Sequence, residues 1–329
     1  MAHRDTVPAG GGRSFSFPSL LLTLLAGLGA LVLSGCGRSP EIPIPPLSPE
    51  LVAARFGMGT VRTFAWTSDG SALVAAGDAG RLYVIDGSTR RFRAAIKCEG
   101  AIRGLAVVGQ TILAGTEQGT VVRYPLDDSG LDKPLATLAA GSPVTAVAVD
   151  SNATLAAIAC ENGQVLLWDM KSSSPQASHS GAHTGAARVA FAADGKTLYS
   201  GGDDGIVRAW AVPALTEVKS TTPQNTKILS LAATADGKVV AGCEDGGVRL
   251  LDGRSLAVSV RYSDLRGPIL SVASIGPLVA AGSTEQKLAI WKTDTDSPGT
   301  LLSSEAVQSA SGAIRACAFS PDGKSLAAA

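Results

Sequence analysis

The clearest structural signal in the chain is residues 182–210, AHTGAARVAFAADGKTLYSGGDDGIVRAW. It holds three short apolar runs, ARVAFAA, KTLYSGG and IVRAW, separated by the turns Asp194-Gly195 and Asp203-Asp204-Gly205. An Asp-Gly pair between alternating apolar runs indicates a tight hairpin, because glycine adopts the positive φ that such turns require. The stretch therefore predicts three antiparallel strands, and residues Leu215 to Ser220 supply a fourth.

The turn glycine of this unit recurs along the chain. The repeated positions are Gly80, Gly119, Gly163, Gly205 and Gly246, with Gln286 in the sixth place. Their spacing of roughly 39 to 44 residues falls in the range of four-stranded propeller blades. One unit of this length cannot bury its own apolar faces, whereas units stacked around an axis can. We therefore predict an all-β propeller of four-stranded antiparallel blades.

The stretch 182–210 resembles a WD repeat, the propeller family named for the dipeptide that closes its third strand. His183, Ser200, Asp204 and Trp210 match the hydrogen-bonded structural tetrad of that family, residue by residue. A buried imidazole and a buried indole N–H both need partners, and a hydroxyl and a carboxylate supply them. The resemblance implies a packing role for His183 and no catalytic one.

The other units keep the pattern of strands and turns but lack some of the polar residues of the tetrad. Trp168-Asp169 is the intact dipeptide in the third unit, and Trp291 closes the sixth. Leu251-Asp252, Tyr124 and Ile85 stand at that place in the fifth, second and first units, and none of these five units has a histidine where His183 stands. Related propellers, of the outer-membrane assembly lipoprotein or quinoprotein type, stay compatible with this pattern.

The seventh unit is incomplete. It has a first strand at Ala313 to Phe319, the turn Ser320 to Gly323 and a second strand from Lys324, and the sequence stops at Ala329. WD propellers close by pairing an N-terminal outer strand with the last blade, and Leu51 to Phe56 fits that role. We expect seven blades with an incomplete last one, either because the chain is truncated relative to its gene, which we favour, or because that blade has three strands.

The N-terminus predicts export. The apolar run Leu20 to Leu33 is short for a membrane span and suits a signal peptide. Leu33-Ser34-Gly35-Cys36 resembles the lipobox of bacterial lipoproteins, which implies cleavage after residue 35 and a lipid on Cys36; a signal anchor from Phe15 to Cys36 is the alternative. We thus expect a signal peptide at 1–35, a Pro-rich tether at 36–50 and the propeller at 51–329. The resemblance implies an outer-membrane lipoprotein of the cell envelope.

Four further cysteines lie in the propeller: Cys98, Cys160, Cys243 and Cys317. Cys160 and Cys243 occupy the same place in the third and fifth units, with a whole blade between them. That separation far exceeds the distance between Cα atoms that a disulfide allows. We expect four buried, unpaired thiols that act as small apolar residues.

Composition disfavours some classes of function but does not identify the function itself. Apolar residues make up 45% of the chain, which indicates a folded protein, and 28 basic residues balance 28 acidic ones, which disfavours nucleic-acid binding. No histidine pair has metal-ligand spacing, so we expect neither a metal nor a cofactor. Turn carboxylates could ring one face; they are Glu117, Glu161, Asp203, Glu244 and Glu285. We interpret them as turn chemistry, and the basic cluster at Arg90, Arg91 and Arg93 as a solvated surface.

The leading hypothesis is a non-catalytic scaffold that binds a protein partner through its blade loops and is anchored to the membrane by the lipid on Cys36. A second hypothesis is an exported propeller enzyme or a quinoprotein-like cofactor protein. A third is the regulatory domain of a longer protein. The low numbers of Trp and His disfavour the second hypothesis.

Overall fold

The computed structural model describes residues 60–126, 133–172, 174–293, 300–303 and 312–329. Cys36 and the expected closing strand Leu51 to Phe56 lie outside the described residues. Within the described residues, no helix combines the length and the apolar character needed to span a membrane.

The described strands form six four-stranded sheets and one two-stranded sheet, each antiparallel. In chain order the strands are β1 (Val61–Trp66), β2 (Ala72–Gly77), β3 (Arg81–Asp86) and β4 (Phe92–Lys97); β5 (Ile102–Val108), β6 (Thr111–Thr116), β7 (Thr120–Pro125) and β8 (Ala136–Ala139); β9 (Val144–Val149), β10 (Leu155–Cys160), β11 (Val165–Asp169) and β12 (Pro175–His179); β13 (Ala187–Phe191), β14 (Thr197–Gly202), β15 (Val207–Ala211) and β16 (Thr216–Ser220); β17 (Ile228–Ala233), β18 (Lys238–Cys243), β19 (Val248–Asp252) and β20 (Val258–Tyr262); β21 (Ile269–Ile275), β22 (Leu278–Ser283), β23 (Leu288–Lys292) and β24 (Thr300–Ser303); and β25 (Cys317–Phe319) with β26 (Leu326–Ala328).

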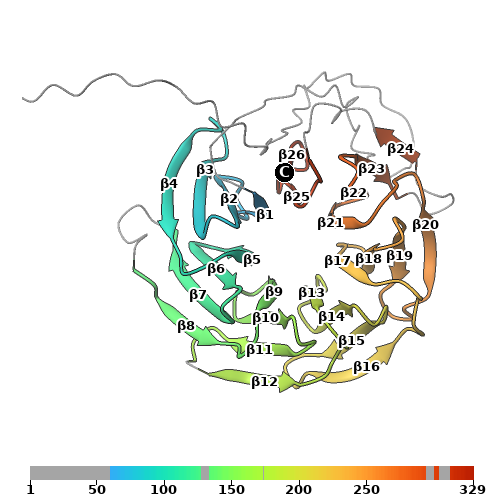
Figure 1. Ribbon diagram of the computed structural model, residues 1–329, viewed down its shortest axis with the longest axis horizontal. Coiled ribbons are helices and arrows are strands. Elements are labelled where there is room, and N and C mark those ends of the chain that lie inside the picture. The colour runs from blue at the N-terminus through green and yellow to red at the C-terminus, as the bar shows by residue number, and fades with distance from the viewer. Residues whose placement is uncertain (1–59, 127–132, 173, 294–299, 304–311) are drawn as a thin grey trace, which may run out of the picture.

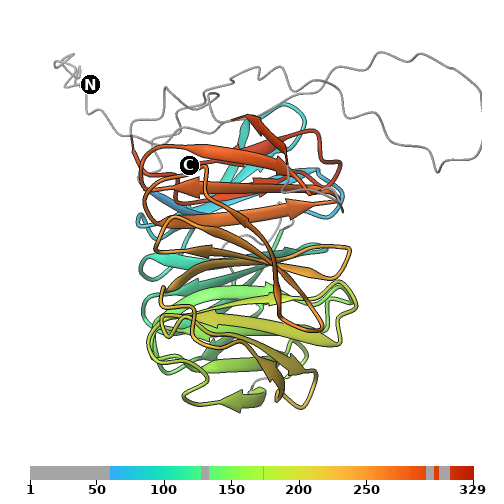
Figure 2. The ribbon, with the colours of Figure 1, turned by 90° about the vertical axis from the view of Figure 1, so that its right-hand side faces the viewer.

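The sheets stand around a central axis, with the first strand of each innermost and the fourth outermost (Figure 1). The side view shows the sheets as successive layers around the ring (Figure 2). The hairpin β25–β26 lies between the first and sixth sheets, where a seventh blade would stand. The predicted all-β propeller of four-stranded blades is confirmed, whereas seven full blades stay a prediction because the described part of the seventh has two strands.

The sequence period reappears as a backbone period. The six repeated turn positions between the second and third strands all have positive φ, between 62° and 86°, and Gln286 reaches 63° without being glycine. At Gly163 a side chain would also collide with the chain, since an added Cβ would lie 1.8 Å from the carbonyl oxygen of His183. The positive φ at this turn is therefore a property of the blade's backbone, which Gln286 also adopts, and does not depend on glycine alone.

Within the fourth blade the second strand is the most buried and the outermost strand the most exposed. In the fourth blade, β14 is buried from Leu198 to Gly202, while all five residues of β16 are exposed. Apolar clusters lie between each pair of neighbouring sheets around the described ring. Trp168, Trp210 and Trp291 are fully buried in these clusters. Blade-to-blade packing therefore provides the core that no single sheet could form.

Side chains of the inner strands also join neighbouring blades by hydrogen bonds. Thr145 Oγ1 donates to the carbonyl oxygen of Ala187 at 2.6 Å, linking the third blade to the fourth. Arg188 Nε donates to the carbonyl oxygen of Leu229 at 2.9 Å, linking the fourth to the fifth. These bonds satisfy buried polar groups at the contacts between blades and fix the angle between them.

The ring is closed by contacts between the first blade and the hairpin β25–β26. Trp66 Nε1 donates to the carbonyl oxygen of Ala318 at 3.3 Å, and Arg90 Nη2 donates to Ser325 Oγ at 3.0 Å. The guanidinium of Arg90 also lies 5.3 Å from the centre of the Trp66 ring, within cation–π range. The interpretation of Arg90 as part of a solvated cluster is wrong: this residue joins the two ends of the described ring.

The four propeller cysteines are buried and form no disulfide. Burial raises the pKa of Cys160, Cys243 and Cys317 to about 11. These thiols therefore stay protonated near neutral pH and pack as small apolar groups, as expected for thiols in this environment.

Candidate functional site

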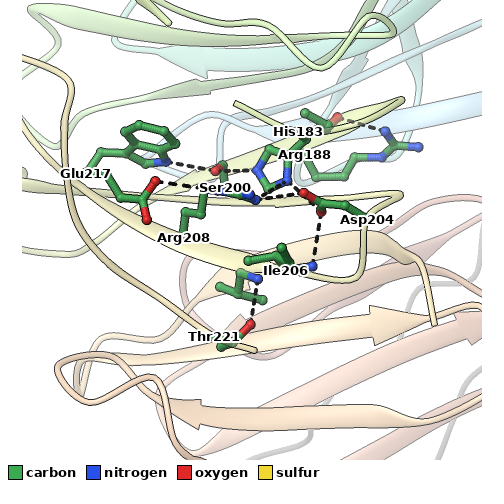
Figure 3. Close-up of polar contacts among 11 residues, drawn as sticks. His183, Arg188, Ser200, Asp204, Ile206, Arg208, Glu217 and Thr221 are labelled. Atoms are coloured by element: carbon green, nitrogen blue, oxygen red, sulfur yellow. Dashed lines mark hydrogen bonds and ion pairs between the residues drawn. The ribbon is translucent and has the colours of Figure 1, made fainter. Parts of the chain in front are cut away.

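The structure brings His183, Ser200, Asp204 and Trp210 together in the fourth blade (Figure 3). His183 precedes β13, Ser200 lies in β14, Asp204 in the following turn and Trp210 in β15. Trp210 Nε1 lies 2.8 Å from Ser200 Oγ, Ser200 Oγ lies 2.7 Å from His183 Nε2, and His183 Nδ1 lies 2.9 Å from Asp204 Oδ1. The four side chains form one continuous chain of hydrogen bonds.

The direction of the protons in this chain follows from its two ends. The indole N–H only donates and the carboxylate only accepts. Trp210 therefore donates to Ser200, whose hydroxyl donates to Nε2 of His183, and Nδ1–H of His183 donates to Asp204. Burial lowers the pKa of His183 below its ordinary value despite the opposing effect of Asp204, so the imidazole is neutral at pH 7.

Arg208 extends the tetrad toward solvent. Its Nη1 donates to Asp204 Oδ2 at 2.9 Å, and its Nε lies 3.6 Å from Glu217 Oε2. Although burial acts to raise it, the pKa of Asp204 is held below its usual range by hydrogen bonds from His183 and Arg208. Sequence reasoning missed Arg208. The available signal was the shared pattern Asp-Gly-x-x-Arg, because Arg249 pairs with Asp245 in the fifth blade in the same way, at 2.7 Å.

The aromatic residues that close the other blades find different partners. Trp291 Nε1 donates directly to Asp264 Oδ2 at 2.8 Å, and Asp264 lies one residue before Leu265, which has the place in the sixth unit that His183 has in the fourth. Trp168 Nε1 donates to the carbonyl oxygen of Ser172 at 2.9 Å. Asp169, the other half of that dipeptide, accepts a turn hydrogen bond from the amide of Lys171. Each blade thus satisfies its buried indole with the acceptor its own sequence supplies.

The tetrad has the residue types of a catalytic triad and the environment of a core. Ser200 and Trp210 are fully buried and His183 is 3% exposed. A nucleophilic hydroxyl must reach its substrate, and it must not be committed to another donor. Ser200 is inaccessible and already accepts from Trp210, so the arrangement stabilises the blade and has no route to a substrate.

A ring of carboxylates surrounds one mouth of the central channel. Its members occupy equivalent positions just after the second strands, where each backbone amide bonds to the residue preceding an inner strand: Asp78, Glu117, Glu161, Asp203 and Glu244. Glu285 falls one residue beyond this position, which Thr284 occupies. The ring contains four of the five carboxylates that the sequence suggested, and Asp78 in addition.

The channel below this ring is a cavity of about 460 Å³. It is lined by inner-strand residues, among them Arg62, Arg103, Arg188 and Arg315. Among the described residues, no group of three His, Cys, Asp or Glu side chains could hold a metal ion. The carboxylate ring and the arginine-lined cavity beneath it thus bring charged side chains of both signs to the same end of the channel.

Two adjoining segments of the chain match one known protein family. Residues 132–169 and 174–211 match the WD domain, G-beta repeat. Each range ends with a third strand, β11 at Asp169 and β15 at Ala211. The WD-repeat match thus covers the first three strands of the blades that carry Trp168 and Trp210, and it includes the whole tetrad.

A curated relative is the Periodic tryptophan protein 2 homolog of Dictyostelium discoideum. It is 23% identical to this chain over 217 residues. The alignment covers 63% of this chain and 23% of the relative. The chain therefore spans about a quarter of the length of this relative.

Proposed function

We propose that this protein is a non-catalytic scaffold, anchored to the bacterial cell envelope by a lipid on Cys36, that binds a protein partner through the loops around the channel mouth. WD-repeat propellers are generally scaffolds for protein partners, and two blades match that family. The observation that carries the proposal is the carboxylate ring, because it displays charged side chains at equivalent places on a rigid frame.

The polar chemistry of the fourth blade supports a non-catalytic role. Its histidine, serine and aspartate are used by one another and by Trp210, in a buried site. Asp203 and Glu244 of the ring lie on turns, where substitution leaves the strands intact. Lys227 Nζ lies 3.9 Å from both carboxylates, so the two turns share one cation at the surface.

Partner binding is tested with the full chain by quantitative cross-linking in envelope extracts. Exchanging Asp203→Asn together with Glu244→Gln removes two charges from the ring without changing its shape. The matched control is Asp194→Asn, in the turn at the opposite end of β14, where asparagine still caps the turn. We expect the ring variant to lose its cross-linked partner and the control to keep it. Equal recovery from both variants would refute binding through this face.

The anchor is supported by the sequence Leu33-Ser34-Gly35-Cys36 after an apolar run. Two or three acyl chains give stable anchoring, which one chain does not. Cys36→Ser should move the protein from the membrane fraction to the soluble fraction and abolish labelling by a fatty-acid analogue. The matched control is Cys98→Ser, which leaves Cys36 intact. Labelling that persists in Cys36→Ser would contradict the proposed anchor.

A further inference from the structure

One position in each blade, and its counterpart just before β25, lines the channel in equivalent fashion. In the six full blades it is the second residue of the inner strand, after a buried first residue; Arg315 follows the buried Ile314 and lies two residues before β25. The occupants around the ring are Arg62, Arg103, Thr145, Arg188, Leu229, Leu270 and Arg315. All seven residues line the same cavity. Four of the seven are arginine, so the radial symmetry of the fold brings together guanidinium groups that are far apart in the sequence.

Two of these arginines are paired with the carboxylate ring. Arg62 binds Asp78 in a bidentate pair at 2.8 and 2.9 Å, and Arg103 lies 3.2 Å from Glu117. Asp78 and Glu117 do not line the cavity. These pairs hold the two guanidinium groups in place, and each guanidinium keeps further N–H donors, because it has five in all.

The other two arginines have no such carboxylate. Arg188 is held by backbone carbonyl oxygens, since its Nε donates to Leu229 at 2.9 Å and its Nη1 to Ala187 at 2.8 Å. The side chain of Arg315 makes no hydrogen bond or ion pair with the described residues. Glu161 is the one carboxylate among the lining residues.

The residues that line the cavity carry a positive surplus. Four arginines line it against one carboxylate, Glu161, while Asp78 and Glu117, which pair with Arg62 and Arg103, lie outside the lining. Lys227 lies 3.9 Å from both Asp203 and Glu244 and balances only one of them, so the surplus belongs to the cavity lining and not to the carboxylate ring. Like charges that converge in a confined space repel one another, and an anion placed between them relieves that repulsion.

We propose that the channel mouth is a binding site for an oxyanion, a carboxylate or phosphate group, held by Arg188 and Arg315 with Arg62 and Arg103 beside them. Planar guanidinium groups recognise both oxyanions by charge-assisted, bidentate hydrogen bonds. The cavity volume lies within the range of small-ligand pockets, which is about 300 to 1,000 Å³. The oxyanion comes from a free small molecule or from an acidic side chain of a bound peptide. The site stands independently of the scaffold role.

The test is a binding titration of the purified propeller at fixed ionic strength, with inorganic phosphate as one probe and hexaglutamate as the other. Hexaglutamine serves as the uncharged control peptide. We expect saturable binding of at least one anionic probe and none of hexaglutamine. Tighter binding of hexaglutamate than of phosphate would identify an acidic peptide side chain as the source of the oxyanion. Tighter binding of phosphate would identify a free anion as the source. If neither probe binds saturably, the proposed site is wrong.

Three variants locate the binding. Arg315→Gln should weaken binding of the anionic probe at least about tenfold, because it removes a charge-assisted donor from the site. Arg315 is chosen over Arg188 because it makes no contact that holds the blades together. Arg315→Lys keeps the charge and should restore part of the affinity, and Arg254→Gln, at an exposed turn outside the cavity, should bind as the wild type does. Equal affinities for Arg315→Gln and Arg254→Gln would also overturn the proposal.

Discussion

Replacing Ser200 by alanine should destabilise the fourth blade through the two groups that its hydroxyl serves. The oxygen accepts from Trp210 Nε1 at 2.8 Å, and its proton is donated to His183 Nε2 at 2.7 Å. Trp210 is fully buried and His183 is 3% exposed, so water cannot take the place of the lost hydroxyl. The substitution therefore leaves one donor and one acceptor unsatisfied in the core.

The magnitude follows from those two groups. A buried polar group that loses its partner costs about 1 to 3 kcal/mol. Taking the lower end for each, because alanine leaves a small space into which the ring and the indole can relax, gives a loss of about 2 kcal/mol. A free-energy change of that size corresponds to an equilibrium constant for local opening about thirtyfold higher.

The assay is amide hydrogen exchange measured on peptides that cover β14 and β15, together with the denaturant midpoint of the whole chain. Ser283→Ala is the matched control. Ser283 is also fully buried in a second strand, β22, but its hydroxyl has no hydrogen-bond partner among the described residues. Its removal should be neutral or slightly stabilising.

A second variant isolates the indole. In Ser200→Ala with Trp210→Phe the orphaned donor is removed together with its acceptor, so the double variant should lose less stability than the sum of the two single variants. Equal exchange in Ser200→Ala and Ser283→Ala would refute the hydrogen-bonded tetrad as a source of stability. Strict additivity in the double variant would refute the Trp210 bond in particular.

Three further predictions concern the pH dependence of stability, a glycine-to-alanine substitution in the core and the reactivity of the buried thiols. Burial lowers the pKa of His183 in the folded state, so protonation favours the unfolded chain. Stability should be complete above the unfolded pKa of about 6.5 and should fall as the pH drops below it. His183→Gln should flatten that part of a profile of melting temperature against pH. Gly202→Ala places a Cβ 2.5 Å from the His183 ring and should cost about 1 to 3 kcal/mol in urea unfolding, whereas Gly312→Ala, with nothing within 4 Å, should be silent. Cys160 and Cys243, with pKa values of about 11, should react with a thiol reagent only after denaturation; rapid labelling of the native protein would contradict their burial.

The sequence was sufficient for the frame because the frame is periodic. Alternating apolar residues indicate strands, turn glycines indicate hairpins, and the spacing of those glycines indicates the length of one blade. The residues of the tetrad could be named because the stretch 182–210 resembles a WD repeat, whose motif gives each of them a place; Ser200 and Trp210 also lie at positions that a strand period of two directs into the core.

The contacts between blades could not be predicted in this way. Asp264 lies in a connection before β21, and nothing in its neighbourhood shows that it meets Trp291. Arg188 lies on β13 and Arg315 just before β25, and a charge in such an apolar pattern normally indicates a solvated face. Their meeting in the channel depends on which strand of each blade is innermost and on the closure of the ring through Trp66 and Arg90, neither of which is a local property.

The inner strands separate two tasks by residue position. Buried residues such as Ile228 and Ile269 pack the blades against one another, while the next residue of each strand sets the character of the channel. The channel lining could thus be changed at Leu229 or Leu270 with little penalty to folding, whereas Thr145 also joins the third and fourth blades through its hydrogen bond to Ala187. Arginine at the two leucine positions would strengthen anion binding in the channel, and glutamate would make the channel favour cations instead.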